Sequence, residues 1–202
     1  MKRWLAPADA LLQQAAWWIV VLGAARGRAG FAAAVAGAVV ALHLLLRPAE
    51  RRHVASTAAA AGAWGLVTDS LLVHAGVIGF GGGAASPAWM VGLWSAFGAG
   101  LTASLRTFAA WPAPRLALAA ALAGPFAYRA GAALGAIELS APTATVLMAV
   151  AAQWGVGVPL LAGVARWAAQ PPRLLAPADA TLAHADAGPG SAAERRRWRW
   201  QR

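Results

Sequence analysis

The chain has 202 residues, of which 60% are hydrophobic and only 12% are charged. A soluble domain carries about a quarter charged residues and just under half apolar residues, so this composition is typical of a membrane protein. The net charge is +10, but the basic residues lie between and after the apolar blocks, which favours cytoplasmic loops near anionic lipid over nucleic-acid binding. The absence of cysteine excludes disulfides, thiolate nucleophiles and cysteine-based metal sites.

Six stretches are long and apolar enough, or nearly so, to cross a membrane as helices, each of which needs about 20 apolar residues. They cover residues 5–22, 31–46, 54–78, 89–110, 116–139 and 143–167. The sequence therefore predicts an all-α integral membrane bundle of about six transmembrane helices. A cleavable signal peptide is an alternative for the first stretch, but the adjacent Trp17 and Trp18 favour a retained helix.

The connections between the later helices are short and carry turn residues. A glycine-rich segment, residues 79–83, separates the third helix from the fourth, and Pro112 and Pro114 separate the fourth from the fifth. Pro142 suits the first turn of the sixth helix. Because the connections are short, consecutive helices are expected to be antiparallel neighbours.

The loop arginines predict the orientation of these helices, since cytoplasmic loops carry the excess of Lys and Arg. Basic residues occupy the N-terminus and alternate connections: Lys2, Arg3, Arg47, Arg51, Arg52, Arg106, Arg115, Arg166 and Arg173. Arg26 and Arg28 in the first connection are exceptions. The pattern predicts a multi-pass protein with both termini in the cytoplasm, and the Ala, Gly, Arg and Pro bias favours a bacterial inner membrane.

The last part of the chain differs in composition. Residues 1–167 are predicted to form the transmembrane bundle, and residues 168–202, rich in Pro, Ala, Asp and Gly, a disordered basic cytoplasmic tail. The tail ends with alternating Arg and Trp at residues 195–200. This pattern suits a lipid headgroup interface, or it serves only as a positive-inside signal.

Asp69 is the clearest candidate for a functional polar residue inside the membrane, where an unpartnered charge costs several kcal/mol. It shares a helical stripe with Gly62 and Gly65, which predicts that this face points into the bundle. The fifth helix carries a similar stripe of small and polar residues: Gly124, Tyr128, Gly131, Gly135 and Glu138.

Arg129 lies beside the second stripe, and its expected depth matches that of Asp69. We therefore predict a buried ion pair between Asp69 and Arg129. The alternative is that Arg129 extends to the outer headgroups while Asp69 meets water or a hydroxyl group.

The remaining polar candidates have mainly structural interpretations. Thr102 and Ser104 in the fourth helix are expected to bond to backbone or a neighbouring helix. Gln13 and Gln14 are expected to bridge helices, with contact to a lipid headgroup as the alternative. The histidines show no ligand spacing, so neither a metal site nor a cofactor is predicted.

Four segments carry a family resemblance. Residues 14–23 (QAAWWIVVLG), the surroundings of Asp69, residues 89–105 (WMVGLWSAFGAGLTASL, which includes Trp94) and residues 124–135 (GPFAYRAGAALG) resemble a bacterial domain-of-unknown-function family of small inner-membrane proteins. The resemblance covers most of the chain except the tail. Members of that family often carry a histidine where this chain has Ala103. The resemblance implies a role beside lipid-modifying enzymes, such as cyclopropane-fatty-acyl-synthase-like methyltransferases.

Three functions remain open. The first is a non-enzymatic bundle that binds membrane lipid or assists a lipid-modifying partner, which fits the absence of a catalytic motif. The second is a small transporter or channel that uses Asp69 and Arg129 and forms a homo-oligomer. The third is an intramembrane lipid-modifying enzyme with Asp69, Glu138, Tyr128 or a histidine as acid or base, which needs two such groups within hydrogen-bond reach.

Overall fold

A computed structural model describes residues 5–170, which lie within one compact unit. The helices are α1 (Leu5–Ala25), α2 (Ala29–Leu46), the short 3₁₀ helix η1 (Pro48–Glu50), α3 (Arg51–His74), α4 (Ala88–Leu101), α5 (Arg106–Ala109), α6 (Ala113–Ala133) and α7 (Thr143–Ala168). Two short strands, β1 (Ile78–Gly79) and β2 (Glu138–Leu139), complete the fold. The predicted tail from residue 171 onward, with its Arg and Trp pattern, lies outside the described residues, as do Lys2 and Arg3.

The predicted all-α fold is confirmed, and each of the six apolar stretches contains a helix. Four helices, α1, α2, α6 and α7, are long and apolar enough to cross a membrane. The helix α3 has 24 residues but is interrupted by polar side chains, and α4 has only 14 residues. The structure therefore supports several membrane-spanning helices, but it does not establish six.

The fourth predicted helix, residues 89–110, is broken, which corrects the sequence-based prediction. Residues 102–105 form turns between α4 and α5. The Thr102 hydroxyl donates a 2.7 Å hydrogen bond to the Ala99 carbonyl, and the Ser104 backbone N–H donates a 3.0 Å bond to Asp9 Oδ2 on α1. Hydroxyl side chains compete with helical backbone bonds, and here a distant carboxylate accepts the bond from the freed amide.

The fifth predicted helix ends earlier than its apolar run. Gly135 adopts a φ of 85°, the left-handed conformation that commonly terminates helices and that glycine adopts without strain. The chain then enters β2, which pairs antiparallel with β1 through Ile78↔Leu139 and Gly79↔Glu138. Gly135 and Glu138 are therefore not part of the helical stripe on α6.

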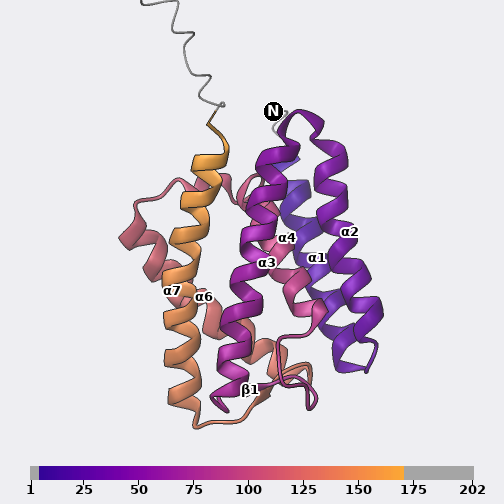
Figure 1. Ribbon diagram of the computed structural model, residues 1–202, viewed down its shortest axis with the longest axis vertical. Helices are drawn as coiled ribbons and strands as arrows, with labels where there is room; N and C mark the ends of the chain where they lie inside the picture. Colours follow the sequence, from indigo (N-terminus) through magenta and orange to yellow (C-terminus); the bar gives the residue numbers. More distant parts are fainter. Residues whose placement is uncertain (1–4, 171–202) are drawn as a thin grey trace, which may run out of the picture. The chain divides into compact units, whose positions relative to one another are not determined.

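The helices pack in a layered order, with α4 at the centre. The largest contacts join α3 to α4 and α6 to α7; α2 packs on α4, α1 on α2, and α3 on α7. Figure 1 shows that the α2–α3 connection and the end of α7 lie at one end of the bundle and that β1 lies at the other. The helices thus run antiparallel between two ends, as their short connections predicted.

Tryptophan rings fill grooves left by glycine in this packing. Three helical glycines lie so close to an indole ring that an added Cβ atom would overlap it: Gly65 against Trp94, Gly124 against Trp154 and Gly157 against Trp64. Glycine weakens a helix by about 1 kcal/mol relative to alanine, so these positions are explained by close helix packing. The predicted inward faces of α3 and α6 are accordingly buried.

Candidate functional site

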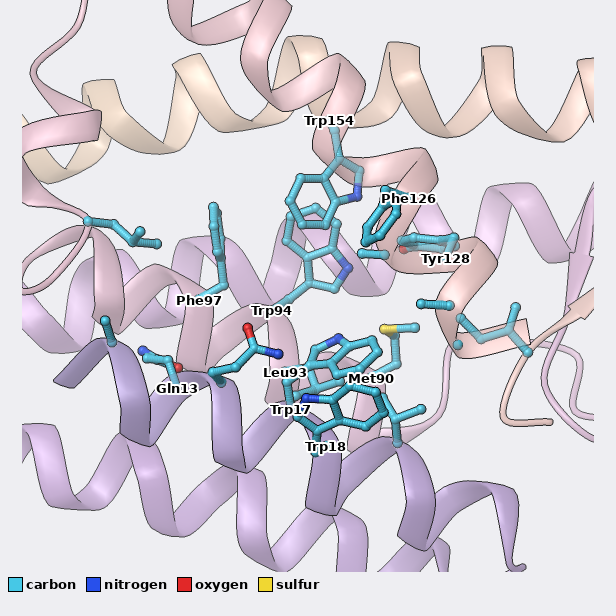
Figure 2. A pocket seen from close by; sticks show the side chains of 18 of the residues that line it. Gln13, Trp17, Trp18, Met90, Leu93, Trp94, Phe97, Phe126, Tyr128 and Trp154 are labelled. Atoms are coloured by element: carbon cyan, nitrogen blue, oxygen red, sulfur yellow. The ribbon is translucent and has the colours of Figure 1, made fainter. Parts of the chain in front are cut away.

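A cavity of about 600 Å³ lies between α1, α4 and α6. Its volume falls within the range of about 300–1,000 Å³ that is usual for small-molecule sites. Helices α1 and α6 line it from opposite sides without packing closely against each other. Figure 2 shows Trp17 and Trp18 on one side of this space and Phe126 and Trp154 on the other.

The cavity is elongated and mostly apolar. On α1 its lining runs from Ala10 to Val21, which corresponds to about 16 Å at 1.5 Å per residue. Aromatic rings form much of the wall, with the Trp94 and Trp154 centroids 5.0 Å apart and those of Phe97 and Trp154 5.5 Å apart. Aromatic pairs in contact at such distances add to the stability of the wall.

The cavity reaches the outer surface of the bundle. Two of its lining side chains are strongly exposed, Trp18 at 46% and Phe126 at 78%, and Gln14 is also exposed. These residues belong to α1 and α6, two of the helices that are apolar enough to span a membrane. In a bilayer this side of the cavity would therefore face lipid.

Asp69 lies directly behind the cavity wall and is completely buried. Its Oδ1 accepts hydrogen bonds from the Tyr128 hydroxyl at 2.5 Å and from Gln153 Nε2 at 2.6 Å, and its Oδ2 accepts one from Trp94 Nε1 at 2.9 Å. Gln153 Nε2 also donates to Thr68 Oγ1 at 2.7 Å. The carboxylate thus joins α3, α4, α6 and α7 through neutral donors.

The predicted ion pair between Asp69 and Arg129 is wrong. Arg129 is exposed and forms no salt bridge with a carboxylate of residues 5–170. The physical reason is helix geometry: consecutive residues differ by about 100° around the axis, so the turn that aims Tyr128 at Asp69 aims Arg129 outward. Arg129 lies in the last turn and a half of α6, where its side chain extends outward, as in the alternative stated above.

Asp69 supports the cavity wall and is not open to a substrate. Both Tyr128 and Trp94 line the cavity while their polar atoms bond to the carboxylate behind them. Asp69 and Tyr128 are therefore two acid–base groups within hydrogen-bond reach of each other, as an intramembrane enzyme would require. The Asp69 carboxylate, however, has no exposed surface that a substrate could contact. The arrangement fixes aromatic side chains in place, which suits binding.

A second polar cluster, not predicted from the sequence, lies near the end of the bundle that carries the α2–α3 connection and Arg47, Arg51 and Arg52, the arginine-rich end. His43 Nε2 on α2 lies 2.7 Å from Asp9 Oδ1 on α1, and His43 Nδ1 lies 2.8 Å from the Val39 carbonyl oxygen. Both ring nitrogens thus face acceptors, whereas neutral imidazole has a single N–H. The pair joins α1 to α2. A charged residue early in the apolar first helix was the sequence signal for this cluster.

The other predicted candidates occupy separate positions. Thr102 is buried and accepts a 2.9 Å hydrogen bond from Arg47, which is a structural contact. Ser104 lines one end of the cavity, and Gln14 lines it from α1. Glu138 is exposed in β2. It pairs with Gly79 of β1, at the end of the bundle opposite the α2–α3 connection (Figure 1). Of the candidates, the structure therefore brings Trp94, Tyr128, Gln14 and Ser104 to the cavity, with Asp69 behind it.

Gln13 does bridge helices, as predicted. Its Nε2 donates a 2.7 Å hydrogen bond to the Ala96 carbonyl and so connects α1 to α4 beside the cavity.

Comparison with known proteins identifies a family. Residues 7–160 match the family described as protein of unknown function (DUF2878), and the chain belongs to it. No curated protein and no solved structure matches the chain.

Proposed function

We propose that this DUF2878 member is a multi-pass membrane protein that binds the apolar chain of a membrane lipid in the cavity between α1, α4 and α6. The observation that carries the proposal is an aromatic-lined, 600 Å³ cavity whose exposed side belongs to helices that are long and apolar enough to span a membrane. A lipid could enter such a site from the bilayer without crossing water.

The dimensions of the cavity support this occupant. Its length along α1, about 16 Å, is close to half of the hydrocarbon core, which is about 30 Å thick. One leaflet of a bilayer has this depth, so a single lipid chain would fit along the cavity. The aromatic walls offer large, rigid apolar surfaces for such a chain.

We further propose that six helical segments cross a bacterial inner membrane with both termini in the cytoplasm. The α4–α5 break shortens the fourth helix, but α4, the turns and α5 together cover residues 88–109. Among the described residues, the end with the α2–α3 connection, α5 and the end of α7 carries Arg47, Arg51, Arg52, Arg106, Arg115 and Arg166. This asymmetry supports a cytoplasmic location for that end.

The bound lipid would be presented to, or withheld from, a lipid-modifying partner enzyme. This part of the proposal rests on the family resemblance of the sequence and on the absence of an exposed acid–base pair in the described cavity.

Lipid copurification tests the binding proposal. Native mass spectrometry of the purified full chain is expected to show a retained lipid, and Ala127→Trp, which fills the cavity from α6, is expected to remove it. Ala119→Trp is the matched control, because Ala119 is a similarly half-buried α6 residue outside the cavity lining. Equal lipid retention in both variants would contradict the proposal.

A further inference from the structure

The lining of the cavity carries no formal charge. All nineteen of its residues, drawn from the described part of the chain, are apolar, aromatic, or neutral and polar. A charged group placed in such a space would lose its hydration without gaining an opposite charge. The part of a ligand that enters the cavity must therefore be uncharged.

Two charged residues near the cavity, Asp9 and Arg47, are already engaged. Asp9, whose carboxylate accepts a bond from the Ser104 amide, is paired with His43. Arg47 donates to the Thr102 hydroxyl and carbonyl at 2.9 and 3.1 Å. Arg106 and Arg129 are exposed and lie outside the lining. The groups of the lining itself that can bond to a ligand are therefore neutral.

Gln14 is the neutral group best placed for this role. Its neighbour Gln13 bonds to the Ala96 carbonyl, but the Gln14 side chain forms no hydrogen bond to any of residues 5–170. An amide left without a partner in hydrocarbon costs roughly 2–7 kcal/mol. Gln14 lines the cavity in the middle of a membrane-spanning helix, so a polar group of the ligand would satisfy it.

Ser104 adds a second hydrogen-bonding group to the lining of the cavity. It follows α4 at the arginine-rich end, lines the cavity, and its hydroxyl oxygen is buried without a partner among the described residues. Rotation about the Cα–Cβ bond is enough to redirect a serine hydroxyl. The cavity thus combines an aromatic body with an amide and a hydroxyl group.

We propose that the ligand is an uncharged amphiphile, with one apolar chain along the aromatic walls and a hydroxyl or ester group bonded to Gln14. A primary amide both donates and accepts, so it pairs with a hydroxyl group or an ester carbonyl equally well. This inference rests on the proposed lipid-binding function and specifies its ligand class.

Photo-crosslinking with two matched probes tests the ligand class. The full chain in nanodiscs is labelled with a diazirine-bearing fatty alcohol and with the alkyl sulfate of equal chain length, and covalent adducts within the cavity are quantified by mass spectrometry. The alcohol is expected to label wild-type protein several-fold more than the sulfate. Gln14→Leu is expected to reduce labelling by the alcohol about fivefold, the equivalent of one hydrogen bond of about 1 kcal/mol.

Controls separate this inference from the function on which it rests. Ala15→Leu adds apolar bulk at an exposed α1 position outside the cavity lining and is expected to leave labelling unchanged. Equal labelling of the cavity by both probes, or no effect of Gln14→Leu, would overturn the ligand class while leaving lipid binding intact. Labelling of the cavity by neither probe would overturn both proposals.

Discussion

The Tyr128 hydroxyl donates a 2.5 Å hydrogen bond to Asp69 Oδ1, and so links α6 to the buried face of α3. The same Tyr128 ring lines the cavity, as does Trp94, whose Nε1 donates to the other carboxylate oxygen. Asp69 therefore holds two cavity residues from behind. The polar interior and the apolar cavity form one structural unit.

Removing Asp69 is expected to cost more stability than removing any one of its donors. Asp69→Ala leaves the donors of Trp94 and Tyr128 buried and unpaired, at about 1–3 kcal/mol for each, while Gln153 keeps its bond to Thr68. Tyr128→Phe removes one of several bonds and should cost about 1 kcal/mol. Melting temperatures in detergent, followed by size-exclusion chromatography after heating, would measure this order.

The matched control for these variants is Arg129→Gln, which alters the exposed neighbour of Tyr128. Its melting temperature is expected to equal that of wild type. Rescue of Asp69→Arg by Arg129→Asp would contradict this account, because it would require the direct ion pair that the hydrogen bonds of Asp69 replace.

The glycine–tryptophan contact between α3 and α4 predicts a sensitive position. Gly65→Ala places a methyl group into the Trp94 ring and is expected to lower the melting temperature and weaken lipid retention together. Gly37→Ala on α2 is the control, since nothing lies within 4 Å of its added Cβ atom. The control should be neutral or stabilising, by up to about 1 kcal/mol. A neutral Gly65→Ala would show that Trp94 is not held tightly.

The Asp9–His43 pair predicts different effects on stability for the removal of His43 and of His74. His43→Ala removes the partner of Asp9 and is expected to lower the melting temperature. His74→Ala, at the exposed end of α3, is expected to have no effect. Equal effects of the two substitutions would contradict a structural role for the pair.

The absence of native cysteine allows a direct test of the orientation. Single cysteines at Ala84, between β1 and α4, and at Ala49, between α2 and α3, occupy exposed positions in connections at opposite ends. In intact cells a membrane-impermeant maleimide is expected to label Ala84→Cys only. Ala49→Cys should react after permeabilisation. The reverse pattern would invert the proposed topology.

A third single cysteine tests on which side of the membrane the α1–α2 connection, which holds Arg26 and Arg28, is located. Ala29→Cys is exposed at the start of α2 and should react from outside in intact cells. Failure to react there, with Ala84→Cys reactive, would show that α1 or α2 does not span the membrane.

Much of the helical layout follows from the sequence because it depends on local properties. The long apolar runs and the spacing of Gly62, Gly65 and Asp69 are enough to predict helices and a buried face on α3. The end of α6 at Gly135 and the break near Thr102 were missed, since apolar runs continue through both. Backbone conformation and the bond from Ser104 to Asp9 decide those boundaries.

The site itself could be predicted only in part. The sequence identifies Asp69 because it is a charged residue in an apolar helix. Its partners depend on which side of α6 faces α3, which the sequence does not show. The match in expected membrane depth favours Arg129 as the partner, although the adjacent Tyr128 is the residue that bonds to Asp69. The cavity could not be predicted, because its walls come from helices far apart in the sequence. The sequence predicts only structural hydrogen bonds for Gln14 and Ser104, because their positions in the cavity depend on the tertiary structure.

The most direct test of lipid binding in the cavity is to map where the diazirine-bearing chain of an uncharged lipid, a monoacylglycerol, crosslinks to the protein in nanodiscs. We predict adducts on α1, α4 and α6 peptides that contain Trp17, Phe97 and Ala130, and loss of these adducts in Ala127→Trp but not in Ala119→Trp. Adducts confined to outward residues such as Leu45 and Leu46 on α2, and equal in both variants, would contradict the account.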